Sequence, residues 1–167
     1  LCEMGADIKG AGSPIIEVRG VKKLHPVTHR VVGDRIEAGT FLAIGGLMDR
    51  PITVKGFEPQ HLGLVLRKYE EMGLTVERGN RCCKGPIHPI DIQTLPYPGF
   101  PTDMQAQTMC LLSMSDGTCI ITENIFENRF MFASELNRMG SDIKIEGHHA
   151  IVHGVKKLSG AQVKSPD

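Results

Sequence analysis

The sequence has no net charge, no long apolar run and no region of low complexity. Its 167 residues contain 19 lysines and arginines against 19 aspartates and glutamates, so it carries no overall positive field for nucleic acid and no polybasic segment for a membrane. No apolar run approaches the roughly 20 residues that cross a bilayer, and the chain does not begin with a secretory signal pattern. These absences favour a cytoplasmic protein of one domain or slightly more, with neither nucleic acid nor membrane as a partner.

The cysteines form neither a disulfide framework nor an evident metal site. The five are Cys2, Cys82, Cys83, Cys110 and Cys119. Their odd number and irregular spacing indicate a reducing compartment. Cys82 and Cys83 with His88 could suggest zinc, but adjacent cysteines rarely turn toward one ion and no second ligand pair follows. We therefore expect no metal and no other cofactor, and we expect Cys110 and Cys119 to be buried as small apolar side chains.

The chain contains an internal repeat of about 67 residues. Met-Gly pairs occur at Met4-Gly5, Met72-Gly73 and Met139-Gly140, at intervals of 68 and 67 residues. Each glycine is expected just after the end of a helix, and the short alternating segment that follows each pair predicts a strand. The segment Gly20–Leu24 recurs as Gly154–Leu158, two periods later. Two features with the same period make coincidence an inadequate explanation.

Each repeat is expected to contain a strand, an apolar helix, a second strand, an amphipathic helix and a terminal pair of strands. Asp34 precedes one apolar helix, Arg35 to Met48, and Asp103 precedes the next, Met104 to Ser115. Asp34 with Glu37 has the spacing of a capping box. Because both helices are apolar on nearly every side, they should be enclosed, with the sheets outside. The pattern predicts an α/β fold.

The segment Phe100–Gln107 is the strongest candidate for chemistry. Pro101 disfavours helix before it, and Thr102 or Asp103 could cap the first free backbone N–H groups. Gln105 has the spacing to complete a capping box from Thr102. At the electropositive end of a helix, the Asp103 carboxylate would stay ionised and could accept a proton or a hydroxyl's hydrogen bond. The alternative is that Asp103 serves only as the helix cap.

The loop Thr122–Phe130 is a second candidate, because it follows a predicted strand and could offer backbone groups to a ligand. Phe126 could pack on a ligand ring or in the core, and the core is the favoured interpretation for a single phenylalanine. Arg129 could bind a phosphate or form a salt bridge with Glu127 or Glu123, and the salt bridge is favoured.

Four segments resemble UDP-N-acetylglucosamine 1-carboxyvinyltransferases, the enolpyruvyl transferases that begin peptidoglycan synthesis. They are Asp34–Thr40, Phe100–Gln107, Glu127–Phe130 and Leu158–Val163. The match runs the full length of the chain in the right order, and the motifs are long enough to be specific. The sister family, 5-enolpyruvylshikimate-3-phosphate synthase, shares the fold but resembles these motifs much less.

This resemblance implies an inside-out α/β barrel in each of two lobes, built of repeated βαβαββ units with helices inside and sheets outside. Residues 1–32 would be the end of the first lobe, and residues 33–101 and 102–167 would be the first two units of the second lobe. The chain would then be a fragment. It should be inactive in isolation, because the family's Lys-Asn pair, its loop cysteine and its phosphoenolpyruvate-binding arginines would lie elsewhere in the parent chain.

The implied reaction adds a sugar hydroxyl to C2 of phosphoenolpyruvate, protonates C3 and then expels phosphate. Asp103 matches the family's proposed base on the 3-hydroxyl of UDP-N-acetylglucosamine. Ile125 matches the position whose backbone contacts the acetamido group, with Phe126 beside it. Further candidates for substrate or interlobe contacts are Asp34, Arg35, Arg129 and Asp167. The implied partners are these two substrates and the remainder of the parent chain.

Two alternatives stay open at this point. A shikimate 3-phosphate enolpyruvyl transferase would need a more basic pocket for its phosphorylated acceptor. A non-catalytic scaffold or binding lobe would keep the repeat without chemistry, and the Phe-Pro-Thr-Asp motif that ends at Asp103 argues against it.

Overall fold

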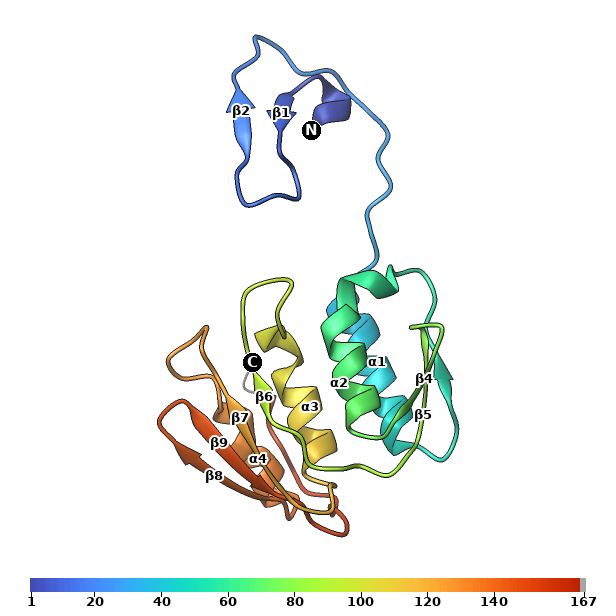
Figure 1. Cartoon of the computed structure of the whole chain (residues 1–167), viewed down its shortest axis with the longest axis vertical. Helices are drawn as coiled ribbons and strands as arrows, with labels where there is room; N and C mark the ends of the chain where they lie inside the picture. The colour runs from blue at the N-terminus through green and yellow to red at the C-terminus, as the bar shows by residue number, and fades with distance from the viewer. Residues whose placement is uncertain (166–167) are drawn as a thin grey trace. The chain divides into compact units, whose positions relative to one another are not determined.

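The computed structural model describes residues 1–165, and the chain divides into two compact units at Val31 and Val32 (Figure 1). The first unit contains an antiparallel hairpin of β1 (Asp7–Lys9) and β2 (Glu17–Arg19) after a short 3-10 turn. Gly10, with a φ of 73°, lies in the connection between the two strands.

The second unit contains two successive sets of similar elements, as the repeat predicts. The first set is α1 (Arg35–Leu47), β3 (Ile52–Thr53), α2 (Gly63–Glu71), β4 (Thr75–Glu77) and β5 (Arg81–Cys83). The second set is β6 (Ile92–Gln93), α3 (Gln105–Leu112), β7 (Thr118–Thr122), α4 (Met131–Arg138), β8 (Asp142–Glu146) and β9 (His149–His153). Each set therefore places an apolar helix before a strand, a second helix and a hairpin. The strand expected before the apolar helix is present in the second set, as β6, but among the described residues of the second unit no strand precedes α1.

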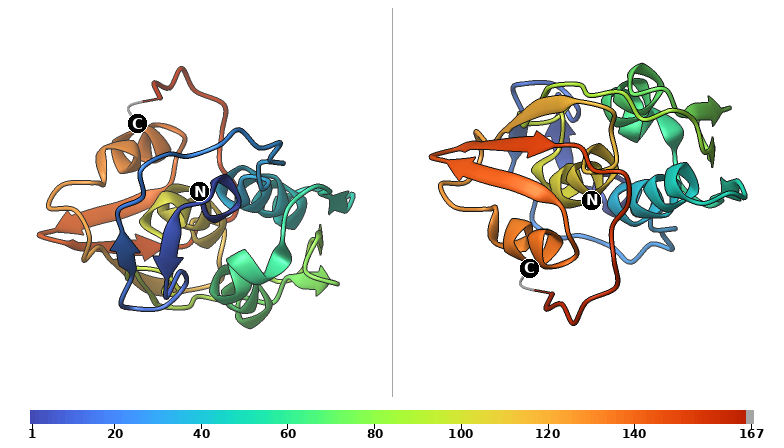
Figure 2. Two further views of the ribbon diagram at one scale, coloured as in Figure 1. Left: turned by 90° about the horizontal axis from the view of Figure 1, so that it is seen from above. Right: turned by 90° about the horizontal axis from the view of Figure 1, so that it is seen from below.

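The strands of the second unit form two sheets, and α1 and α3 lie between them (Figures 1 and 2). One sheet has the order β3-β5-β4 and is antiparallel. The other has the order β6-β7-β9-β8, in which only β6 and β7 are parallel. This α/β arrangement, with helices inside and sheets outside, confirms the expected fold class. The second sheet begins at β6, before residue 102.

The core follows the expected pattern on α2 and α3 but not on all of α1. Every residue of α3 is buried or half-buried, and α2 buries Val65, Leu66 and Tyr69. In α1, however, Phe41 is 46% exposed and Ile44 is 40% exposed, so this helix is not fully enclosed. Its other faces pack on α3, β3 and β5.

The cysteines of the core are free thiols, as expected. Cys82 and Cys119 are buried and Cys110 is half-buried. Burial raises the pKa of Cys119 to about 12 and that of Cys82 to about 11, which keeps both thiols protonated and unreactive at neutral pH. Within residues 1–165, no cluster of three or more His, Cys, Asp or Glu side chains is arranged to hold a metal ion.

The three Met-Gly pairs have the same backbone geometry. Gly5, Gly73 and Gly140 have φ values of 92°, 102° and 93°, which confirms the left-handed conformation expected after a helix end. In each repeat, a later backbone N–H donates to the methionine carbonyl. These bonds run from His25 to Met4 (2.9 Å), from His88 to Met72 (2.8 Å) and from Ser159 to Met139 (2.7 Å). The repeat is therefore built by the main chain as well as by side chains.

The helices of the described chain are short. Across residues 1–165, none combines the length and the apolar content that crossing a membrane requires.

Candidate active site

Asp103 lies in the 3-10 turn Thr102–Met104 that leads into α3, and its side chain does not cap the helix. Its Oδ1 atom forms an ion pair with Arg129 Nη1 at 2.9 Å, and half of its side chain is exposed. The expected capping box between Thr102 and Gln105 is also absent, because both side chains donate instead to Glu123. The capping predictions for this helix are therefore wrong. The Asp103 carboxylate is held from one side and open to solvent.

Glu123 follows β7, and the sequence pattern indicated it only as a possible partner of Arg129. It is only 2% exposed, yet its carboxylate accepts four hydrogen bonds. The donors are Thr102 Oγ1 (2.7 Å), Gln105 Nε2, and the backbone N–H groups of Ile125 (2.7 Å) and Phe126 (3.0 Å). Burial alone would raise the pKa of Glu123, but the hydrogen bonds outweigh it and hold the pKa below its usual value. The buried side chain is thus an ionised carboxylate.

Arg129 contacts Asp103 directly and Glu123 through Thr102. The Nη1 atom that pairs with Asp103 also donates to Thr102 Oγ1 at 3.2 Å. The guanidinium carbon lies 5.0 Å from the centre of the Phe126 ring, within the range of a cation–π interaction. The expected salt bridge to Glu127 or Glu123 is replaced by the one to Asp103, because the loop folds back over the start of α3.

The loop after β7 presents Ile125 and Phe126 at the surface. Phe126 is 52% exposed, so the expectation of a core position for this ring is wrong. A cavity of about 490 Å³ lies here, between the loop and the β8–β9 turn. It is lined by Glu123, Asn124, Ile125, Phe126, Glu127, Gly147 and His148. The structure thus brings the candidates Asp103, Ile125, Phe126 and Arg129 together in one connected group.

Asp34 and Arg35 belong to a different part of the second unit. Asp34 caps α1, because its Oδ1 atom accepts from the backbone N–H groups of Ile36 (2.7 Å) and Glu37 (3.3 Å). Arg35 lies over the Tyr97 ring at 5.7 Å. No contact described within residues 1–165 joins either residue to Asp103. Asp167 lies outside the described residues.

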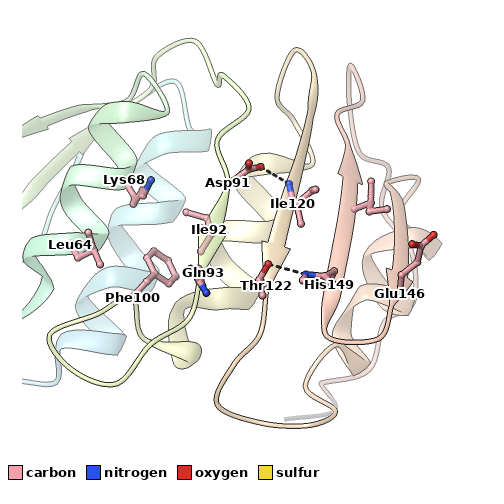
Figure 3. A pocket seen from close by; sticks show the side chains of 11 residues that line it. Leu64, Lys68, Asp91, Ile92, Gln93, Phe100, Ile120, Thr122, Glu146 and His149 are labelled. Atoms are coloured by element: carbon pink, nitrogen blue, oxygen red, sulfur yellow. Dashed lines mark hydrogen bonds between the residues drawn. The ribbon is translucent and has the colours of Figure 1, made fainter.

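A larger cavity of about 640 Å³ lies between α2 and the outward face of the second sheet (Figure 3). Two of its polar side chains are already paired: Asp91 accepts from the Ile120 N–H at 2.8 Å, and Thr122 bonds with His149 at 3.0 Å. None of the candidate site residues within the described range 1–165 lines it. Its larger size therefore does not by itself make it a site of chemistry, since Asp91 and Thr122 serve the sheet.

The fold and this group of residues define an α/β protein of the enolpyruvyl transferase type. The enolpyruvyl transferase NikO from Streptomyces tendae has a similar structure over 92% of this chain, with a TM-score of 0.75 and 27% identity, and the match covers 38% of NikO. EPSP synthase from Acinetobacter baumannii shares the fold alone, with a TM-score of 0.55 and 17% identity over 95% of this chain and 39% of its own.

The family model described as EPSP synthase (3-phosphoshikimate 1-carboxyvinyltransferase) matches residues 1–167, and the chain belongs to this family. A protein of Symbiobacterium thermophilum named UDP-N-acetylglucosamine 1-carboxyvinyltransferase 1 is 52% identical over 99% of the chain. The UDP-N-acetylglucosamine 1-carboxyvinyltransferase of Geotalea daltonii is 48% identical over the whole chain. The matches cover only 38% and 41% of these two relatives, so the chain spans about two fifths of their length. The resemblance seen in the motifs is confirmed.

Proposed function

We propose that the parent protein transfers the enolpyruvyl group of phosphoenolpyruvate to the 3-hydroxyl of UDP-N-acetylglucosamine and releases phosphate. The observation that carries this proposal is the 46–52% identity, along essentially the whole chain, to relatives named for this sugar nucleotide. The reaction would be the first committed step of peptidoglycan synthesis, in the cytoplasm, and would serve cell wall biogenesis, cell shape and cell division. It would need neither a metal nor another cofactor.

Asp103 is the proposed base on the sugar hydroxyl. A carboxylate is far too weak to ionise an alcohol in advance, so Asp103 would orient the oxygen and take its proton as the C–O bond forms. Two features support this role. Arg129 fixes Oδ1 at 2.9 Å, and half of the Asp103 side chain is open to an incoming hydroxyl.

Ile125 and Phe126 are the proposed contacts to the sugar. The Ile125 N–H is already donated to Glu123, so its carbonyl oxygen is the backbone group available to the N–H of an acetamido substituent. The half-exposed Phe126 ring offers an apolar face to the sugar. Arg129 would then hold the base and this ring in a fixed relation to one another.

We also propose the placement of the chain in the parent protein. Residues 1–32 would end the first lobe, and residues 33–101 and 102–167 would be the first two βαβαββ units of the second. The isolated chain should have no activity, because a site that closes between lobes needs catalytic groups from both.

The test is phosphate release from phosphoenolpyruvate by the parent protein, with UDP-N-acetylglucosamine or shikimate 3-phosphate as the acceptor. We expect release only with the sugar nucleotide, and loss of that release in Asp103→Ala. Release with shikimate 3-phosphate instead would replace the proposed acceptor. Release with neither acceptor would leave a scaffold without this chemistry, and turnover by the 167 residues alone would refute the division of the site between lobes.

A further inference from the structure

Four side chains around the start of α3 form a closed cycle of contacts. Glu123 accepts from the Phe126 N–H, and the Phe126 ring lies under the Arg129 guanidinium. Arg129 donates to Thr102, and the Thr102 hydroxyl donates back to Glu123. Asp103 is attached to this cycle through Arg129. The buried carboxylate is thus the one member that binds both the loop backbone and the helix start.

We propose that Glu123 is a positioning residue of the transferase site. Its buried carboxylate holds the sugar-binding loop and the base Asp103 in fixed positions relative to each other. The inference rests on the proposed function and extends it, because it assigns a role to a residue that would not touch either substrate. Catalysis that relies on placement is sensitive to small displacements, and a shift of about 1 Å can cost about 100-fold in rate.

The hydrogen-bond pattern uses both oxygens of the Glu123 carboxylate. One oxygen of Glu123 accepts from the Ile125 and Phe126 N–H groups, and the other accepts from Thr102 and Gln105. A glutamine has the same shape but only one acceptor oxygen, so two donors would face its NH₂ group in either orientation. The loop and the helix start could then not both keep their present contacts in full.

The charge of Glu123 also fixes the direction of the Thr102 hydroxyl. Thr102 has a single hydroxyl proton and donates it to Glu123, so its lone pairs are turned to Arg129 Nη1. The two hydrogens of Nη1 can then serve Thr102 and Asp103 at the same time. Thr102 is therefore the link through which the buried carboxylate acts on the base.

Steady-state kinetics of the full-length parent protein would test this role with Glu123→Gln and Thr102→Val. We expect Glu123→Gln to raise the KM for UDP-N-acetylglucosamine by about 10-fold and to lower kcat by about 10-fold to 100-fold, with little change in the KM for phosphoenolpyruvate. Thr102→Val removes both bonds of the Thr102 hydroxyl, to Glu123 and to Arg129, but leaves the bonds from Glu123 to the loop backbone. It should therefore lower kcat without raising the sugar KM. Thr102→Ser retains the hydroxyl and should restore kcat to within about 3-fold of the wild type.

Amide hydrogen exchange supplies a readout that does not depend on turnover. The peptide containing Ile125 and Phe126 should exchange faster in Glu123→Ala, which removes both acceptor oxygens, and at the wild-type rate in Thr102→Val. Glu70→Gln, which removes an exposed carboxylate from α2, is the matched control and should behave as the wild type in both assays.

The outcomes separate this proposal from the proposed function. If the wild type shows sugar-dependent release and Glu123→Gln keeps the wild-type kinetics, the role of Glu123 is refuted and the proposed function stands. The same follows if kcat falls equally in Thr102→Val and Thr102→Ser. If the wild type shows no sugar-dependent release, the proposed function is refuted. Unchanged exchange in Glu123→Ala would refute the positioning of the loop independently.

Discussion

The two repeats of the second unit place an aspartate before equivalent apolar helices and use it in different ways. Asp34 binds the free backbone N–H groups at the start of α1. Asp103, in the corresponding place before α3, caps nothing and faces Arg129. Asp34 thus satisfies the backbone of its own helix, whereas Asp103 is oriented by a cation of the loop and leaves the helix start without a side-chain cap. We propose from this comparison that Asp34 is structural and Asp103 reactive.

The origin of this difference lies in the loop that follows the strand of each repeat. In the second repeat this loop supplies Glu123 and Arg129, which bind Thr102 and Asp103 and replace the cap. In the first repeat, the positions 68 and 67 residues before Glu123 are Lys55 and Gly56. No carboxylate is available there to engage the start of α1.

The largest expected effect comes from removing the charge of each aspartate in turn. Asp103→Asn should lower the kcat of the parent protein by about 10²-fold to 10⁴-fold, because the amide cannot take the proton. Asp34→Asn should leave kcat within about 2-fold of the wild type, since asparagine caps helices about as well as aspartate. Steady-state phosphate release would measure both, and similar losses in the two variants would remove the distinction between them.

A smaller effect is expected on stability, and here the larger loss should come from replacing Asp34. Asp34→Ala should lower the free energy of unfolding by about 1 kcal/mol, because two N–H groups at the start of α1 lose their acceptor. Asp103→Ala should change it by about 0.5 kcal/mol or less, since an exposed ion pair contributes little. Urea unfolding of the parent protein would compare them, and a larger loss at Asp103 would show that this residue is also structural.

The smallest expected effect is on the stability of the protein at acid pH. The folded-state pKa of Glu123 lies below its ordinary value, because hydrogen bonds outweigh burial. Its contribution to stability is therefore fully present above the ordinary glutamate pKa and is lost as the pH falls through the lower folded value. Urea midpoints measured from about pH 6 to about pH 3 should fall less steeply in Glu123→Gln than in the wild type. Parallel curves would contradict the lowered pKa.

Much of the fold could be predicted from the sequence, because it depends on local patterns. The Met-Gly spacing located the helix ends, and the apolar segments that follow Asp34 and Asp103 located α1 and α3. The exposure of Phe41 on α1 could not be predicted in the same way. It depends on which faces of the helix have a partner in this stretch of chain, and that is a tertiary property.

Most residues of the site could be predicted from the sequence, but the hydrogen bonds that connect them could not. The motif resemblance identified Asp103, Ile125 and Phe126, and the structure brings them together. Glu123 was considered only as a partner for Arg129, because a single glutamate after a strand has no local signal for burial. Its four donors come from two segments about 20 residues apart, and only the packed structure shows that they converge.

The hydrogen bonds from His25, His88 and Ser159 to the three methionine carbonyls have a consequence for how such a molecule can change over evolutionary time. Both atoms of each bond belong to the main chain, so almost any substitution at the donor position except proline preserves the hydrogen bond. A duplicated unit could therefore diverge in its side chains while keeping its architecture. One copy would be free to acquire new chemistry as its neighbour continued to serve as scaffold.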